Sequence, residues 1–263
     1  AYFRNVMENG LNLHQRVALI AGPMTTTVSS IVMTLTRLGA DCVILDPDKT
    51  VASAFTNSIN DSREISDKYG RAVAIQSELK TPEQIKDAVG RASTTFGGLD
   101  IFIDANMLQK PTPIRLDGGV DLIDDMLDRH LKLPMMLTQA VLGYLKSRKK
   151  GRIIYLLNES PVAKIKEDVL AQGARTGLIG FAAALAKQTA EFNVTVNSLT
   201  VALTEEYILA HDPESKSIKE AMEKMKQIDP SLKITEADKI SQTVAFLVSP
   251  MGATMNGQKF ALS

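Results

Sequence analysis

The sequence predicts a single doubly wound α/β domain, in which a seven-stranded, mostly parallel β-sheet is covered by helices on both faces. Short apolar runs bounded by turn residues alternate with longer stretches of helical periodicity, which is typical of βαβ units. The 263 residues, of which 44% are apolar, are enough to bury one sizeable core. Right-handed crossovers between parallel strands then place helices on both faces of the sheet.

The expected elements alternate along the chain. The strongest apolar runs predict strands at residues 17–21, 42–45, 72–75, 101–103, 153–157 and 195–199, with residues 259–262 as a candidate seventh strand. The stretches between them predict helices at residues 28–38, 49–69, 82–96, 117–147, 168–191 and 236–248. Residues 204–238 differ, because they are rich in Glu and Lys and are broken by Pro213 and Pro230. This segment predicts a small helical insertion that lies as a lid over one edge of the sheet.

The charge and hydropathy of the chain exclude several classes of protein. Thirty basic residues balance thirty acidic residues, so no overall field attracts nucleic acid or an anionic membrane. No segment reaches the roughly 18 uninterrupted apolar residues that a membrane span needs. Residues 1–15 lack the apolar stretch of a secretory signal. We therefore expect a cytoplasmic protein that binds neither nucleic acid nor membrane.

Cysteine and histidine are too sparse for a disulfide framework or a metal centre. The single cysteine, Cys42, lies in an apolar run and is expected to be an inert core thiol in a reducing compartment. His14, His130 and His211 are scattered, and no cluster of His, Cys or carboxylates has the spacing of metal ligands. We expect this chain to bind no metal.

Four segments, taken in order, carry a resemblance to a known family. They are VALIAGPMTTTVSSIVMTLTRLGADCVILD, GGLDIFIDANM, TQAVLGYLKSRKKGRIIYLLNES and GARTGLIGFAAALAKQTAEFNVTVNSL. Through them the chain resembles the short-chain dehydrogenase/reductase family over nearly its whole length. The resemblance implies a Rossmann-type domain, a nicotinamide dinucleotide at the turn after the first strand, and a catalytic set of Ser, Tyr, Lys and Asn.

The turn after the first strand departs from the family pattern. The resemblance places Gly22, Thr26 and Val28 where the family has three glycines, which let backbone N–H groups and a helix terminus approach the pyrophosphate. Thr26 and Val28 add branched bulk, and Pro23 removes an N–H donor. We expect no dinucleotide to bind here.

Two further positions of the dinucleotide site are also altered. Asp46 ends the second strand, where an acidic residue of the family binds the ribose of NAD; the alternative is that Asp46 caps the next helix. Asn-Asn-Ala-Gly of the family corresponds to residues 104–107, so that Met107 replaces the glycine. Met24 and Met107 are predicted to fill the vacant groove, because methionine adapts to irregular gaps.

All four catalytic positions implied by the resemblance are changed. Ser corresponds to Asn158, Tyr to Ala171, Lys to Arg175 and Asn to His130. Ala171 has no group that can exchange a proton, and Arg175 stays protonated near pH 7. Asn158 can still orient a carbonyl, but orientation without an acid gives binding rather than turnover. We therefore predict a non-catalytic member of the family.

The sequence then favours a structural role in an oligomer. We expect a hetero-oligomer, most simply a heterotetramer, with an active paralogous dehydrogenase that carries the NAD and oxidises a 3-hydroxyacyl-CoA. The resemblance implies that the helical segments at residues 117–147 and 168–191 form the interface. One alternative is a homo-oligomeric, ligand-sensing regulatory protein that uses the former substrate pocket. Another is an enzyme of altered chemistry that uses His130 with Asp104 or Asp128.

Overall fold

One parallel sheet organises the molecule. The computed structural model describes residues 10–63, 68–106, 119–159, 169–212 and 214–262. The sheet has seven strands in the order β3-β2-β1-β4-β5-β6-β7, and each neighbouring pair is parallel. They are β1 (Val17–Ala21), β2 (Asp41–Asp46), β3 (Ala72–Gln76), β4 (Ile101–Asp104), β5 (Arg152–Glu159), β6 (Thr195–Ala202) and β7 (Lys259–Leu262). The predicted doubly wound α/β fold is confirmed, and the sheet is parallel throughout.

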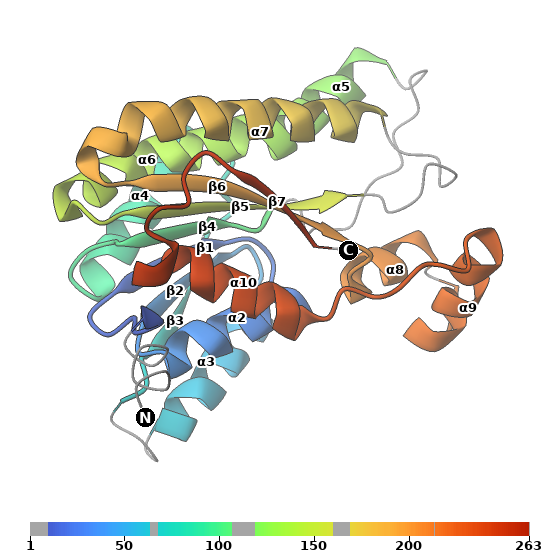
Figure 1. Ribbon diagram of the computed structural model, residues 1–263, viewed down its shortest axis with the longest axis horizontal. Helices are drawn as coiled ribbons and strands as arrows, with labels where there is room; N and C mark the ends of the chain where they lie inside the picture. The colour runs from blue at the N-terminus through green and yellow to red at the C-terminus, as the bar shows by residue number, and fades with distance from the viewer. Residues whose placement is uncertain (1–9, 64–67, 107–118, 160–168, 213, 263) are drawn as a thin grey trace.

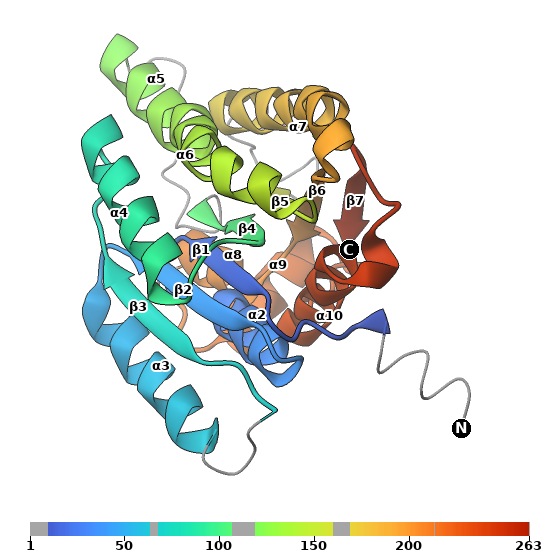
Figure 2. The same ribbon diagram turned by 90° about the vertical axis from the view of Figure 1, so that its left-hand side faces the viewer.

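Helices cover both faces of this sheet (Figure 1). One face carries α4 (Pro82–Thr95), α6 (Leu133–Arg148) and α7 (Val169–Thr189), and the other carries α2 (Thr26–Arg37), α3 (Lys49–Arg63) and α10 (Ala237–Val248). Figure 2 shows the sheet edge at β3 lying between α4 and α3. Two short 3-10 turns, η3 (Ala190–Phe192) and η4 (Pro250–Gly252), follow α7 and α10.

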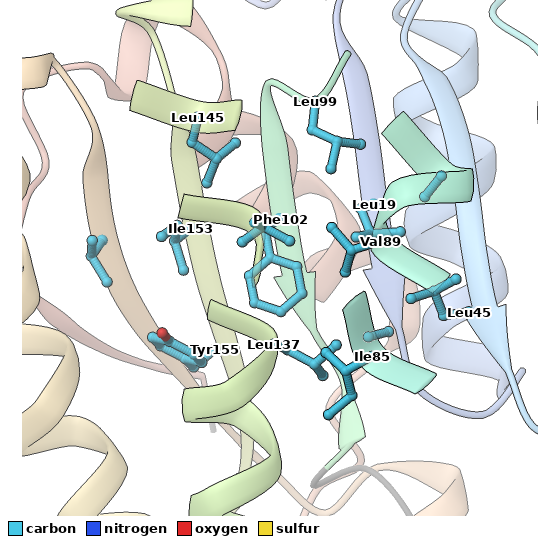
Figure 3. Packing of buried hydrophobic residues seen from close by; sticks show 14 of the residues in the cluster. Leu19, Leu45, Ile85, Val89, Leu99, Phe102, Leu137, Leu145, Ile153 and Tyr155 are labelled. Carbon is cyan, nitrogen blue, oxygen red and sulfur yellow. The ribbon is translucent and has the colours of Figure 1, made fainter. Parts of the chain in front are cut away.

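The hydrophobic core has two halves, one on each face of the sheet. Successive residues of a strand point to opposite faces, so Leu19 packs in the first half and Ile20 in the second. Figure 3 shows the first half, where Phe102 of β4 lies beside Leu19 and Leu137 of α6 lies beside Ile85 of α4. Burial on both faces explains why the strands appear in the sequence as continuous apolar runs rather than as an alternating pattern.

The long helix predicted at residues 117–147 is divided in the structure. α5 (Val120–Leu127) leads into a π-helical turn, η2 (Asp128–Lys132), which leads into α6. Pro134 lies in the first turn of α6, lacks an N–H and crowds the carbonyl of His130 four residues earlier. The widened π turn accommodates this interruption of the helical hydrogen bonds. His130 therefore lies in a local irregularity rather than on a regular helix.

Residues 204–238, which we call the lobe, form two short helices. These are α8 (Glu205–His211) and α9 (Ile218–Ile228), capped by the hydroxyl groups of Thr204 and Ser217. Figure 1 shows both helices to one side of the main body. They pack on an apolar cluster of their own, which contains Leu203, Tyr207, Ile208, Ala221, Met222, Met225 and Leu232.

Candidate functional site

The candidate site lies where the order of the strands reverses. β1 lies at the centre of the sheet and pairs with both β2 and β4. From β1 the chain adds β2 and β3 on one side, and then crosses to add β4 to β7 on the other side. In register, the carboxyl ends place Ala21 beside Asp104, and Asp104 beside Tyr155. Ligands of open parallel sheets bind outside the carboxyl ends of the strands at such a point. The turns that follow β1, β2 and β4 therefore line the candidate site.

Gly22 opens the turn after β1 and is required there by close packing. Its φ of 146° lies in the region that favours glycine, and an added Cβ would lie 2.8 Å from the backbone carbonyl carbon of Ala105. Its N–H donates to the carbonyl oxygen of Leu45 at 3.1 Å. Gly22 thus connects the turn to β2 and packs against the end of β4. These contacts within the protein are enough to explain why a glycine is needed at this position.

The amino terminus of α2 receives a carboxylate from the lobe. The backbone N–H of Thr27 donates to Glu206 Oε1 at 2.7 Å, and the Thr27 hydroxyl donates to Oε2 at 3.2 Å. Thr25 caps the helix by accepting the N–H of Val28 at 3.2 Å. A helix terminus of this kind is where a phosphate binds in dinucleotide sites. Here its N–H groups are engaged by side chains of the protein itself.

The two branched residues of the turn have different surroundings. Thr26 is exposed at the first position of α2. Val28 is fully buried in the half of the core that also contains Ile20 and Ile31. The bulk of Val28 is therefore accommodated inside the protein, and Glu206 is the group found against the helix terminus. Sequence reasoning missed Glu206 because its contact spans 179 residues and belongs to no local motif.

Asp46 is also engaged by the backbone. Its carboxylate is 2% exposed. Oδ2 accepts the N–H of Met24 at 2.7 Å, and Oδ1 accepts the N–H of Asp48 at 2.8 Å. Asp48 in turn accepts the N–H of Thr50 in the first turn of α3. Asp46 therefore connects the β1 turn to the entry of α3, while Asp48, directly before Lys49, is the residue that caps this helix.

Asp104, at the end of β4, is a buried carboxyl with an unusual pKa. Its Oδ1 accepts the N–H of Asn106 at 3.1 Å and the side-chain amide of Asn106 at 2.5 Å. Burial raises the pKa of Asp104 to about 6, and the two hydrogen bonds from Asn106 oppose this increase. Met24 is half-buried against the neighbouring core. Met107, its predicted partner in filling the groove, lies outside the described residues.

A buried pair of hydroxyl groups lies beside this position. Tyr155 of β5 and Thr138 of α6 are 2.6 Å apart, oxygen to oxygen. The Thr138 hydroxyl donates its single proton to the carbonyl oxygen of Pro134 at 2.7 Å, so Tyr155 is the donor to Thr138. Burial raises the pKa of Tyr155 above its usual value, which keeps the phenol protonated. The pair therefore belongs to the core packing between β5 and α6.

The four catalytic positions lie on three elements. Asn158 is half-buried near the end of β5, and His130 is half-buried in η2. Ala171 and Arg175 lie one turn apart on α7, where Arg175 is buried. The π turn packs against α7, so His130 is brought to the helix that carries the other two.

The two carboxylates considered as partners of His130 have other contacts. Asp128 forms an ion pair with Lys132 at 3.0 Å, and Asp104 accepts hydrogen bonds from Asn106. At the position of the family tyrosine, Ala171 supplies no proton donor. The described partners of Asp128 and Asp104 are therefore Lys132 and Asn106.

The described residues offer neither a metal centre nor a membrane span. Within them, no group of three His, Cys, Asp or Glu side chains could hold a metal ion. Among the described helices, none combines the length and apolarity needed to cross a bilayer.

The chain belongs to the short-chain dehydrogenase family. The family pattern described as short chain dehydrogenase matches residues 16–217, which include the whole β1 to β6 framework and all four catalytic positions. The fold and the position of the site at the carboxyl ends of β1 and β4 agree with this membership.

Known relatives include reductases and a dehydrogenase subunit. An NADPH-dependent aldehyde reductase-like protein of Arabidopsis thaliana chloroplasts is 27% identical over 263 aligned residues, which cover 97% of this chain and 95% of the relative. The (2S)-[(R)-hydroxy(phenyl)methyl]succinyl-CoA dehydrogenase subunit BbsD of Thauera aromatica is 23% identical and covers 94% of this chain and 95% of its own. A solved dehydrogenase/reductase from Sinorhizobium meliloti superposes with a TM-score of 0.81 at 20% identity, over 98% of this chain and 97% of that one.

Proposed function

We propose that this protein is a non-catalytic subunit of the short-chain dehydrogenase fold that associates with an active, NAD-dependent paralogue. One observation carries the proposal: Glu206 accepts the backbone N–H of Thr27 at the helix terminus where a dinucleotide phosphate would bind. Asp46, which would bind the ribose, is occupied by the N–H groups of Met24 and Asp48. The NAD of the complex is therefore held by the partner subunit alone.

The chemistry of the catalytic positions supports the same proposal. Ala171 has no proton to donate, and Arg175 has a guanidinium that stays charged near neutral pH. Reduction or oxidation of a carbonyl compound needs a proton to move together with the hydride. Substitutions at both positions leave a scaffold that supports the partner rather than a second reaction centre.

An apolar stripe supports association through the helices that the resemblance implies. Val120, Ile123 and Leu127 of α5 are 70%, 36% and 40% exposed and lie three and four residues apart, on one side of the helix. Tyr144 of α6 is also exposed. Large apolar side chains grouped on one surface mark contacts with another protein. We place the paralogous subunit on this surface, in a heterotetramer.

The substrate of the partner is proposed from the relatives. One of them is named as a subunit of a dehydrogenase that acts on (2S)-[(R)-hydroxy(phenyl)methyl]succinyl-CoA. The partner of this chain would accordingly oxidise a 3-hydroxyacyl-CoA thioester such as hydroxybenzylsuccinyl-CoA, the type of step found in anaerobic toluene degradation. This chain would support the substrate-binding half of that subunit.

Calorimetric titration of NAD(H) and NADP(H) tests the proposal. The isolated chain is expected to give no binding, and the complex that co-purifies from the native source is expected to bind through its partner. Micromolar binding by the isolated chain contradicts the proposal. A stable monomer without a partner also contradicts it. A small molecule that raises the melting temperature of a homo-oligomer would instead favour the ligand-sensing alternative.

A further inference from the structure

The lobe is packed as a unit that is separate from the main body. Its apolar cluster, which includes Tyr207, Met222 and Met225, shares no member with either half of the main core. At its inner end, the backbone N–H of Thr235 donates to the carbonyl oxygen of Leu203. The apolar side chains of the lobe pack mainly against one another. The position of the lobe on the main body therefore depends on the few polar contacts between them.

The start of the lobe and the first turn of α10, into which the lobe leads, contact the same helix of the body. Near the start of the lobe, Glu206 binds Thr27 of α2. At its end, Asp238 accepts the hydroxyl of Ser30 at 2.9 Å. Thr27 and Ser30 lie three residues apart and therefore share one side of α2. The first two turns of α2 thus hold α8 of the lobe through Glu206 and the start of α10 through Asp238.

The two attachments differ in strength and in setting. Asp238 belongs to a network in which Ser241 of α10 also contacts Ser30 at 3.1 Å and Thr34 at 3.0 Å. That end continues into α10, which packs firmly on α2. The other end depends on Glu206, because α8 contacts α2 in the described hydrogen bonds and ion pairs through this side chain alone.

The electrostatics of α2 favour a negative charge at this point. Residues 26–29, its first turn, include no Asp or Glu. The N–H groups of this turn have no acceptor within the helix, and the positive end of the helix dipole lies here. A negative charge that stabilises them must therefore come from elsewhere in the chain. A charge-assisted hydrogen bond from a backbone N–H is about twice as strong as a neutral one. Glu206 supplies this charge at 2.7 Å.

We propose that Glu206 is an intramolecular latch that holds the α8 end of the lobe closed against α2 in the protein without any nucleotide. The carboxylate takes the place that an anionic ligand would take at a helix terminus. The lobe therefore keeps one position and does not need a bound cofactor to order it. When the latch is removed, α8 and α9 move away from α2 as a unit, while the other end of the lobe stays joined to α10, which Asp238 and Ser241 hold on α2. This inference goes beyond the proposed function and does not depend on the partner.

Hydrogen exchange of the purified chain, followed by peptide mass spectrometry, tests the latch. Glu206→Ala is expected to increase amide exchange in the peptides of α8 and α9 by on the order of tenfold, while the strands keep their protection. Glu206→Gln retains an acceptor without the charge, so an intermediate increase is expected. Glu205→Ala, in the same helical turn, is the matched control and is expected to leave the exchange of the lobe unchanged.

A second variant keeps the test valid if Glu206→Ala folds poorly. Thr27→Val removes the hydroxyl that contacts Oε2 and leaves the backbone N–H in place. It is expected to increase exchange in the lobe by less than Glu206→Ala does. Unchanged exchange of the lobe in both variants overturns the latch, as does an equal effect of Glu205→Ala. A uniform increase over the whole chain also overturns it, because a latch acts locally.

Discussion

Asp104 shows how a single buried group can make stability depend on pH. Its pKa is raised to about 6 by burial, from a usual value of 3.8. Below pH 3.8 the carboxyl is protonated in both the folded and the unfolded chain. Between about pH 4 and 6 only the unfolded chain loses the proton, so the free energy of unfolding falls as the pH rises. Above pH 6 the loss is complete, and a shift of about two units corresponds to roughly 3 kcal/mol at most.

Asp104→Asn is therefore expected to raise the free energy of unfolding relative to wild type, and to raise it more at pH 7.5 than at pH 4. The amide oxygen can still accept the hydrogen bonds from Asn106, and no charge is buried. Urea unfolding at both pH values measures the difference between variant and wild type. Asp121→Asn, at an exposed position of α5, is the control. An equal pH dependence of wild type and Asp104→Asn would contradict the raised pKa.

Cys42 gives a second prediction at the scale of one residue. The thiol is fully buried, as its apolar surroundings in the sequence predict, and burial raises its pKa. A disulfide reagent at pH 8 is expected to modify it only when the protein opens, at a rate that increases with added urea. Fast labelling of the native protein by the reagent would show that β2 is accessible.

Single residues also mark where prediction from the sequence stops. The substitutions at Ala171, Arg175 and Thr26 are visible in the sequence because the family pattern supplies a register. Glu206 and Asp238 are not, because their contacts with α2 join residues 179 and 208 positions apart. A tertiary contact between a charged surface residue and a distant helix terminus leaves no periodic signal. Only the fold shows that these two acidic residues reach one helix.

At the scale of elements, burial decides which parts of the fold are predictable. The strand predicted at residues 17–21 is β1 itself, because a strand buried on both faces is a continuous apolar run. β5 and β6 extend further than predicted, to Glu159 and Ala202, because the two strands continue to pair in register beyond the apolar run of β5. The helix predicted at residues 117–147 is interrupted by η2, because helical periodicity alone does not locate the effect of Pro134.

The contact between α2 and α10 gives a prediction at this scale. Ser241 is buried and lies within hydrogen-bond distance of the hydroxyl groups of Ser30 and Thr34. Ser241→Ala leaves those hydroxyl groups without this partner, so we expect it to lower the free energy of unfolding by about 1–2 kcal/mol. Urea denaturation measures the change, with the exposed neighbour Gln242→Ala as the control. A cost of less than 0.5 kcal/mol, as for ordinary surface substitutions, would show that the network adds little.

At the scale of the whole molecule, the proposed association surface is open to a direct test. Ile123→Lys together with Leu127→Lys places two charges on the exposed apolar stripe of α5. Because both side chains are partly exposed, we expect little change in the thermal stability of the subunit. We expect a clear loss of association, since unpaired charges in an interface are costly to desolvate.

Light scattering of the purified oligomer gives the size of the assembly with and without these substitutions. Val51→Lys, at an exposed position of α3 on the opposite face of the sheet, is the matched control. If the double variant assembles as the wild type does, the partner lies on another surface. The non-catalytic role would then remain open, because the titration of nucleotides tests it independently.

The packing of α2 against α10 also has a consequence for the order in which the chain folds during synthesis. α2 emerges from the ribosome early, but its apolar side contacts Ile240 and Val244, which are made near the end of the chain. At 5–20 residues per second, roughly 10–40 seconds separate the two helices. In that interval the apolar side of α2 is uncovered, and it becomes a site where a chaperone can bind the nascent chain. Synthesis of α10 is therefore the step that allows this side of α2 to be covered.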